Sequence, residues 1–172
     1  MALRFSSTAD ITLEVVITSD SSVSCDEKAV QDYLTEGDKS GLSIGEDATI
    51  FIIKPLTLEE RERAEIKAGA HTRSELGRYL SEQKPQDQEG YARWHHSLSE
   101  DEREALGTYQ DYLNKCYYEI VRSGLVSIKG IEGDPFDLLM TIKPEPTRVA
   151  TLMELVCHIQ RLSLLSEDEK KN

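Results

Sequence analysis

The sequence predicts an α+β protein in which a small N-terminal antiparallel β-sheet packs with about three main α-helices. Two observations predict this class: two short apolar stretches of strand character lie near the N-terminus, and amphipathic patterns of helical period fill most of the remainder. A chain of 172 residues suits one domain. We therefore expect a single domain over residues 1–172, with strands and a long inserted arm in 1–56 and a helical part in 57–172.

The two expected strands are residues 11–18, ITLEVVIT, and residues 48–54, ATIFIIK. In the first stretch apolar and polar side chains alternate, which is typical of a strand with one buried face. Pro55 follows the second stretch and cannot donate a hydrogen bond to a ladder, so the strand should end there. We expect the two strands to pair in one small sheet.

The segment between the strands, residues 19–47, is rich in serine, aspartate and glycine and is too long for a hairpin turn. Within it, Ser24 and Glu27 have the spacing of a capping box, which predicts a short helix. Val30 and Leu34 would form a small apolar edge on that helix. We expect the segment to be an arm that contacts a neighbouring subunit through this edge and becomes ordered on binding.

The first of the three main helices should span about residues 58–80. Thr57 and Glu60 form a capping box at its start, and acidic residues fill its first turn, where the helix dipole favours them. A polar break over residues 81–93 should separate it from the next helix.

The second main helix should span residues 99–123, between a capping box of Ser99 with Glu102 and a stop at Gly124. The third should span residues 147–165. It carries one continuous apolar stripe, which predicts a buried structural element. The stripe consists of Val149, Leu152, Met153, Val156, Ile159 and Leu162.

The second helix carries four tyrosines that could pack in the core or bind a partner. Tyr109 and Tyr117 lie on its predicted apolar face, whereas Tyr112 and Tyr118 fall off that face. Exposed tyrosines are good interface anchors because they combine a large apolar ring with a hydroxyl. We therefore predict Tyr112 and Tyr118 as partner-binding residues, with core packing of the tyrosines as the alternative.

The charge balance narrows the class of partner. Acidic residues outnumber basic ones by 32 to 20, and the formal net charge is -12. A nucleic-acid-binding protein must neutralise phosphates, and an anionic membrane surface also attracts basic residues, so we expect neither partner. No apolar run reaches the length of about 20 residues that a membrane-spanning helix needs, and the first ten residues show no signal-peptide pattern.

The stretch YARWHHSLSEDE places Trp94 beside two histidines, which raises the question of a metal or catalytic site. Neighbouring residues on a helix point about 100° apart, so His95 and His96 cannot share one ion as histidines four residues apart do. The other histidines, His71 and His158, are distant in sequence. Trp94 stands just ahead of a predicted helix start and suits a hydrophobic staple. A small metal-dependent enzyme around the histidine pair is the weakest alternative.

No other chemical motif is present in the chain. It contains no Walker loop, no nucleophile elbow and no dinucleotide-binding glycine motif. Cys25, Cys116 and Cys157 are odd in number and far apart, which favours reduced thiols. We therefore assign no catalytic, cofactor-binding or metal-binding residue, and we expect no enzyme and no cofactor.

Three stretches resemble elements of tailed-bacteriophage morphogenesis proteins. ATIFIIKPLTLEERERAE looks like their apolar strand, Pro-Leu-Thr turn and acidic helix. YYEIVRSGLVSIKGI is similar to their helix-to-strand junction, and ATLMELVCHIQRLSLLSEDEKKN looks like their C-terminal helix. Together these stretches cover about a third of the chain. The proteins in question are small and non-catalytic, and some of them are tail assembly chaperones.

The resemblance implies a role in virion assembly that rests on protein–protein interaction. It implies a structural protein, a minor component of the phage head, neck or tail, which would be found in the virion after assembly in the host cytoplasm. The alternative is a tail assembly chaperone that binds tail proteins and is absent from the mature particle. The implied partners are other phage structural proteins, or further copies of the same chain in a symmetric assembly.

Overall fold

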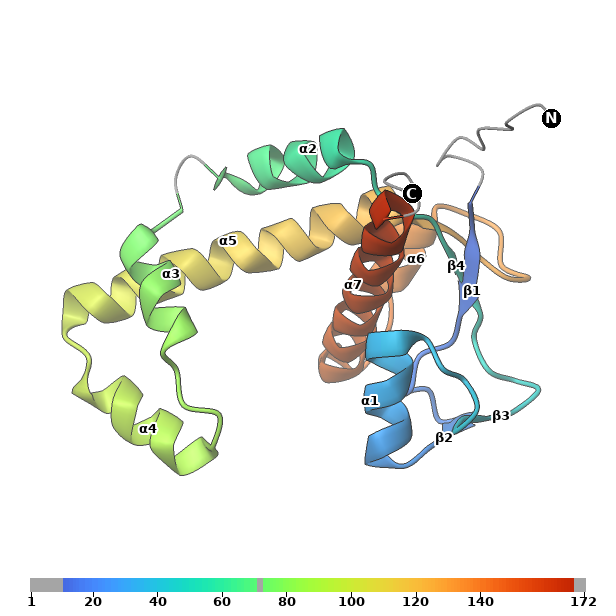
Figure 1. Cartoon of the computed structure of the whole chain (residues 1–172), viewed down its shortest axis with the longest axis horizontal. Coiled ribbons are helices and arrows are strands. Elements are labelled where there is room, and N and C mark those ends of the chain that lie inside the picture. Colours follow the sequence, from blue (N-terminus) through green and yellow to red (C-terminus); the bar gives the residue numbers. More distant parts are fainter. Residues whose placement is uncertain (1–10, 71–72, 169–172) are drawn as a thin grey trace. The chain divides into compact units, whose positions relative to one another are not determined.

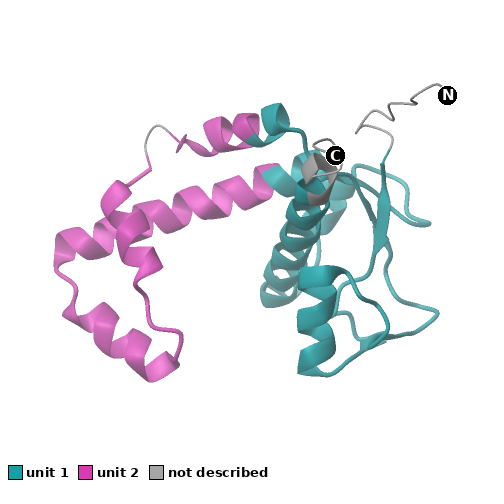
Figure 2. Ribbon diagram, in the orientation of Figure 1, with its two compact units in different colours: residues 1–61, 120–172 teal, residues 62–119 magenta. Residues whose placement is uncertain are grey.

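The computed structural model describes residues 11–70 and 73–168, with side chains as far as Leu164. The described chain gathers into two compact units (Figure 2). Unit 1 joins the residues up to Arg61 to those from Ile120 onward, and unit 2 is Glu62–Glu119. The predicted α+β class is confirmed. The described residues contain seven helices, however, so the prediction of about three main helices is wrong in number.

The sheet of unit 1 has three antiparallel strands, β1 (Leu13–Val15), β4 (Phe51–Ile53) and β5 (Leu125–Ile128). β1 and β4, which pair with each other, lie side by side in Figure 1. The predicted pairing of the two N-terminal strands is confirmed, although each has only three residues. β4 is the central strand, because β5 pairs with its other edge. β5 is not among the two strands expected from the sequence.

The segment over residues 19–47 is folded into unit 1. It forms β2 (Val23–Ser24), α1 (Glu27–Glu36) and β3 (Ser43–Ile44), and β2 pairs with β3. The predicted cap at Ser24 is wrong: that residue is in β2, and the side chain of Asp26 caps α1 by accepting from the Ala29 N–H at 2.8 Å. The expectation of a projecting arm is also wrong for α1, which packs against the C-terminal helix.

The single helix predicted over residues 58–80 is two helices, α2 (Leu58–Ala68) and α3 (Glu75–Glu82). The capping box of Thr57 with Glu60 is confirmed by both of its hydrogen bonds, of 2.9 and 3.2 Å. Gly69, just past the end of α2, has a φ of 94°, which is left-handed and which favours glycine. Ser74 caps α3. Residues 71 and 72, among them His71, lie outside the described part.

The predicted polar break over 81–93 contains the start of a further helix, α4 (Gln88–Ser97), which Asp87 caps by accepting from the Gly90 N–H at 2.6 Å. α5 (Glu100–Gly124) then follows. Its capping box of Ser99 with Glu102 is confirmed, and so is its end at Gly124. A β-carbon at Gly124 would lie 2.7 Å from the Ile159 side chain, so the close approach there requires glycine.

Two helices complete unit 1. α6 (Pro135–Met140), which Asp134 caps, is absent from the sequence prediction. α7 (Glu145–Asp168) extends the predicted third helix by a few residues at each end. Its apolar stripe is confirmed at Leu152, Val156 and Ile159, which are buried, but Val149 and Met153 are 47% and 40% exposed.

The core of unit 1 lies where α1 and α6 pack against α7 and where α6 also packs against β5. Its fully buried side chains come from α1, β4, α6 and α7, and they include Tyr33, Ile53, Leu139, Leu155 and Ile159. Within the described residues, no helix is both long and apolar enough to cross a membrane.

Candidate functional site

Val30 and Leu34, the predicted partner-binding edge, are half-buried side chains on α1. Their neighbours Ala29 and Tyr33 are buried and direct α1 toward the rest of unit 1. The guanidinium of Arg161 on α7 donates to the backbone carbonyls of Tyr33 and Leu34, which fastens the C-terminal end of α1. The edge is therefore partly covered by contacts of α1 with the rest of unit 1.

Tyr112 is buried, with 7% of its surface exposed, so the prediction that it falls off the apolar face of α5 is wrong. The buried line of α5 runs through Tyr112, Cys116 and Ile120, at steps of four residues, instead of through Tyr109. The Tyr112 hydroxyl is hydrogen-bonded to Arg73, and burial raises the pKa of this tyrosine. Tyr118, the other tyrosine predicted to bind a partner, is half-buried and already interacts with another group of the protein.

The helices of unit 2 expose several large apolar side chains that the sequence prediction does not assign to binding. Ile66 on α2 is 65% exposed, Tyr79 on α3 is 57% exposed and Leu76 on α3 is 46% exposed. α3 turns its other side toward α5, because Leu80 is buried and a β-carbon at Gly77 would lie 2.0 Å from a backbone oxygen of α5. Leu76 and Tyr79 thus form an apolar outer edge of α3.

The Trp94, His95 and His96 stretch lies on α4 and belongs to an aromatic cluster. The ring of Tyr91 lies 5.7 Å from the ring of Trp94 and 5.7 Å from the ring of His95, on which it stacks. His96 is exposed. In the described part of the chain, no group of three or more histidine, cysteine, aspartate or glutamate side chains is placed to hold a metal ion.

Trp94 does not act as the hydrophobic staple of α5. It lies inside α4, whose last residue is Ser97. The residue directly before the Ser99 cap is Leu98, which is buried with 7% of its surface exposed. Leu98 therefore has the staple position, and the prediction failed because residues 88–97 form a helix, α4, that the sequence analysis does not expect.

A pocket of about 550 Å³ opens in unit 1 beside the sheet and α7. Phe51, Ile128 and Leu138 supply apolar walls, and several threonines line the remainder. The charged side chain among its lining residues, Asp20, already accepts hydrogen bonds from the Ser22 and Thr49 N–H groups. Burial alone would raise the pKa of Asp20. The hydrogen bonds together outweigh this effect, so the pKa lies below its usual value. This carboxylate stabilises the chain's own loops.

His158 on α7 is the most unusual polar residue of unit 1. It is fully buried, and neither ring nitrogen has a hydrogen-bond partner among the described residues. Its ring lies 4.5 Å from the ring of Tyr33 on α1. Burial lowers the pKa of His158 to about 4, and the positive charges of Arg161 and Lys39 lower it as well. The imidazole is therefore neutral at pH 7.

The three free thiols differ in exposure. Cys116 is buried, and Cys25 and Cys157 are half-buried. Burial raises the pKa values of Cys116 and Cys157, and the negative charges of nearby glutamates raise them as well. A thiol with a raised pKa is a poor nucleophile at neutral pH because little of it is thiolate.

No family model matches this chain, and neither a curated protein nor a solved structure shows significant similarity to it.

Proposed function

We propose that this protein acts through protein–protein contacts in the assembly of a bacteriophage particle, as a minor structural component of the head, neck or tail. The phage assignment comes from the resemblance of three stretches to tailed-phage morphogenesis proteins. The observation that carries the mode of action is the apolar outer edge of α3, Leu76 and Tyr79, together with Ile66 of α2. Large apolar side chains left in water on a small unit are typical of protein interfaces.

A further feature supports a binding role for unit 2. Its helices begin at well-formed caps on Ser74, Asp87 and Ser99, so the exposed side chains stand on regular elements. A binding surface on a regular element loses less conformational entropy on association than a surface on a loop. In this proposal, the partner is another structural protein of the same particle.

Mass spectrometry of purified particles tests the proposal directly. A structural component is present at stoichiometric levels in the mature virion. A chaperone is found on tail proteins in infected cells and is absent from the virion, which is the alternative reading of the same resemblance. If the protein is found neither on the particle nor on any of its assembly intermediates, the proposal is wrong.

A pair of variants separates the proposed surface from general effects on folding. Replacing Leu76 and Tyr79 by serine should abolish co-purification with the partner and leave the circular dichroism spectrum unchanged, because both side chains are exposed. Leu164→Ser is a matched control, since Leu164 is 57% exposed on α7 of unit 1. Equal loss of the partner in both variants would refute the assignment to α3.

A further inference from the structure

Unit 2 contains a second feature that the assembly role does not use, a pocket of about 530 Å³. Residues from the end of α3, the α3–α4 connection, α4 and α5 line it, and all of them belong to unit 2. This volume falls in the range of pockets that hold small organic ligands, roughly 300–1,000 Å³. The pocket therefore has the size of a small-molecule site.

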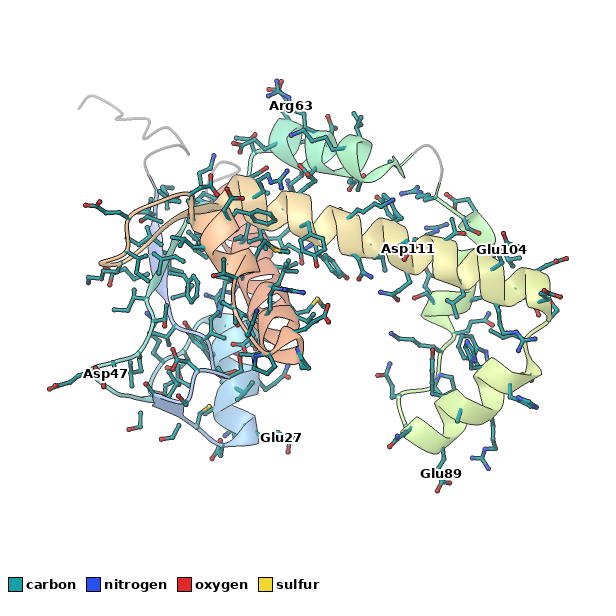
Figure 3. All side chains as sticks on the ribbon, turned by 180° about the vertical axis from the view of Figure 1, so that it is seen from behind. Glu27, Asp47, Arg63, Glu89, Glu104 and Asp111 are labelled. Carbon is teal, nitrogen blue, oxygen red and sulfur yellow. The ribbon has the colours of Figure 1, made fainter. Side chains whose placement is uncertain are left out.

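The charged side chains around the pocket are mostly basic. Lys84 and Arg103 line it, both are exposed, and neither has an ion-pair partner among the described residues. His95 adds an imidazole. The carboxylate among the lining residues is that of Asp87, which caps α4. Glu89, although it is close in sequence, is absent from the lining and points away from α5 (Figure 3).

An aromatic and apolar wall stands beside these basic groups. Tyr91 is 40% exposed, lines the pocket, and is held by its stack on His95 and its contact with Trp94. Leu106 lies on the α5 side. A ring held in this way is a preorganised stacking surface, because its rotation is already restricted.

Gly107 provides an independent indication that the pocket is used. It lines the pocket from the interior of α5, where glycine is the least favourable residue apart from proline. A β-carbon at this position would meet no atom within 4 Å, so no packing contact within the protein requires glycine. Gly77, where α3 and α5 meet, has by contrast a clear packing reason. A ligand that lies close to the α5 backbone would explain the glycine at position 107 in the same way that close packing explains Gly77.

We propose that this pocket binds a small organic anion that carries both a planar ring and a carboxylate or phosphate group. Arg103 and Lys84 bind the anionic group, Tyr91 stacks on the ring, and the bare backbone at Gly107 leaves room for the ligand. The local basic groups offer this anion a favourable site on a protein whose formal net charge is -12. This inference is independent of the proposed role in assembly.

Calorimetric titration of the full chain tests the proposal with four probes. Adenosine 5′-monophosphate and benzene-1,3-dicarboxylate carry both a ring and a charge, inorganic phosphate carries charge alone, and adenosine carries a ring alone. We expect at least one ring-bearing anion to bind with a Kd on the order of 1 mM or tighter. The bare phosphate and adenosine should bind at least about tenfold more weakly. The ring-bearing anion that binds identifies phosphate or carboxylate as the preferred group, and Trp94 emission gives a second readout beside Tyr91.

Three variants locate the binding. Arg103→Gln should weaken the interaction by about tenfold, as expected for a lost charge-assisted contact. Gly107→Leu should block the pocket without disturbing the fold, because the space at that position is open. Arg93→Gln is the matched control, since Arg93 is exposed on α4 and absent from the pocket lining. It should bind like the unchanged protein.

Several results would overturn the proposal. One is the absence of saturable binding by either ring-bearing anion up to about 5 mM. Another is adenosine or phosphate binding as tightly as the ring-bearing anion that binds, which would remove the role of the charge or of the ring. A third is Arg93→Gln weakening binding as much as Arg103→Gln, which would show general electrostatic attraction instead of a site.

Discussion

His158 should make the stability of this protein depend on pH between about 4 and 6.5. Its pKa is about 4 in the folded protein and 6.5 in an unfolded chain. The folded state therefore keeps the imidazole neutral, while the unfolded state takes up a proton as the pH falls below 6.5. Above about pH 7 the titration of His158 does not change the free energy of unfolding, whereas stability is lost progressively as the pH falls from 6.5 toward 4.

The magnitude follows from the difference between the two pKa values. Each pKa unit corresponds to about 1.4 kcal/mol, so the full difference of His158 amounts to about 3 kcal/mol below pH 4. At pH 5 the unfolded imidazole is almost fully protonated and the folded one is almost fully neutral, which gives a loss of about 2 kcal/mol. Such a loss is a large fraction of the 5–15 kcal/mol that is typical of a folded domain.

Carboxylates titrate in part of the same range, so the contribution of His158 must be isolated. The pKa values of Asp20 and Glu60 are lowered in the folded protein, and both therefore also reduce stability as the pH falls through the carboxylate range. His158→Phe removes the titrating group and keeps a ring against Tyr33. It breaks no hydrogen bond within the described residues, because neither nitrogen of His158 makes one.

Urea unfolding followed by circular dichroism at pH 7.5, 6.5 and 5.0 provides the measurement. At pH 7.5 the variant should be at least as stable as the unchanged protein, since a buried polar group without a partner costs free energy. Between pH 7.5 and 5.0 the unchanged protein should lose about 2 kcal/mol more than His158→Phe. His96→Phe, at an exposed histidine, should show no such difference. Parallel pH profiles for the unchanged protein and His158→Phe would refute the reasoning.

Three further predictions concern packing and can be measured by the same urea experiment. Gly107→Ala should stabilise α5 by up to about 1 kcal/mol, whereas Gly77→Ala should destabilise unit 2 because its β-carbon would lie 2.0 Å from a backbone oxygen. The opposite order would show that α3 and α5 meet differently. Tyr33→Phe should cost about 1–3 kcal/mol, because the hydroxyl makes two hydrogen bonds to buried backbone groups; an unchanged stability would mean that water replaces it. Leu152→Ala should cost about 2–5 kcal/mol and Val149→Ala less than about 0.5 kcal/mol, and equal effects would contradict the buried face of α7.

Helix caps, which depend on only a few neighbouring residues, were mostly predicted correctly from the sequence. The capping boxes that begin at Thr57 and Ser99 are both present, since each needs only two side chains three residues apart. The box at Ser24 failed because Asp26 offers a competing cap two residues later. An aspartate is as good a cap as a serine, and Ser24 is held in extended backbone by its pairing with Ser43.

The division of the first main helix was also visible in the sequence, although the prediction passed over it. Gly69 is a typical helix stop. Ser74 is a typical helix start, and its hydroxyl accepts a hydrogen bond from the Gly77 N–H. The apolar residues on either side keep helical spacing, which favours a continuous helix when periodicity alone is considered. The helix stop at Gly69 was the stronger signal here, because a residue with left-handed backbone ends the helical hydrogen-bonding pattern whatever residues follow it.

Tertiary packing accounts for the predictions that failed on α5. Its apolar residues allow two adjacent lines of contact, one through Tyr109 and one through Tyr112. Which line is buried depends on the segments that pack against α5: Gly77 of α3 approaches Ala105 and Tyr109, whereas Arg73, just before α3, is hydrogen-bonded to Tyr112. Nothing within α5 records this approach. The exposed edge of α3 was missed for the same reason, since the sequence of α3 does not show which of its apolar residues face α5.

His158 shows how a single polar residue could have corrected the prediction for residues 19–47. It stands inside the apolar stripe of α7, between Leu155 and Ile159, where a polar side chain must be buried with the stripe. A buried imidazole needs a neighbour that tolerates it, and aromatic rings do so at their faces. Tyr33 is the aromatic residue that α1 brings to it, at 4.5 Å. Because this contact buries both rings, removing α1 would expose α7 and leave a polar group on an apolar surface, so we infer that the inserted segment is needed for unit 1 to fold.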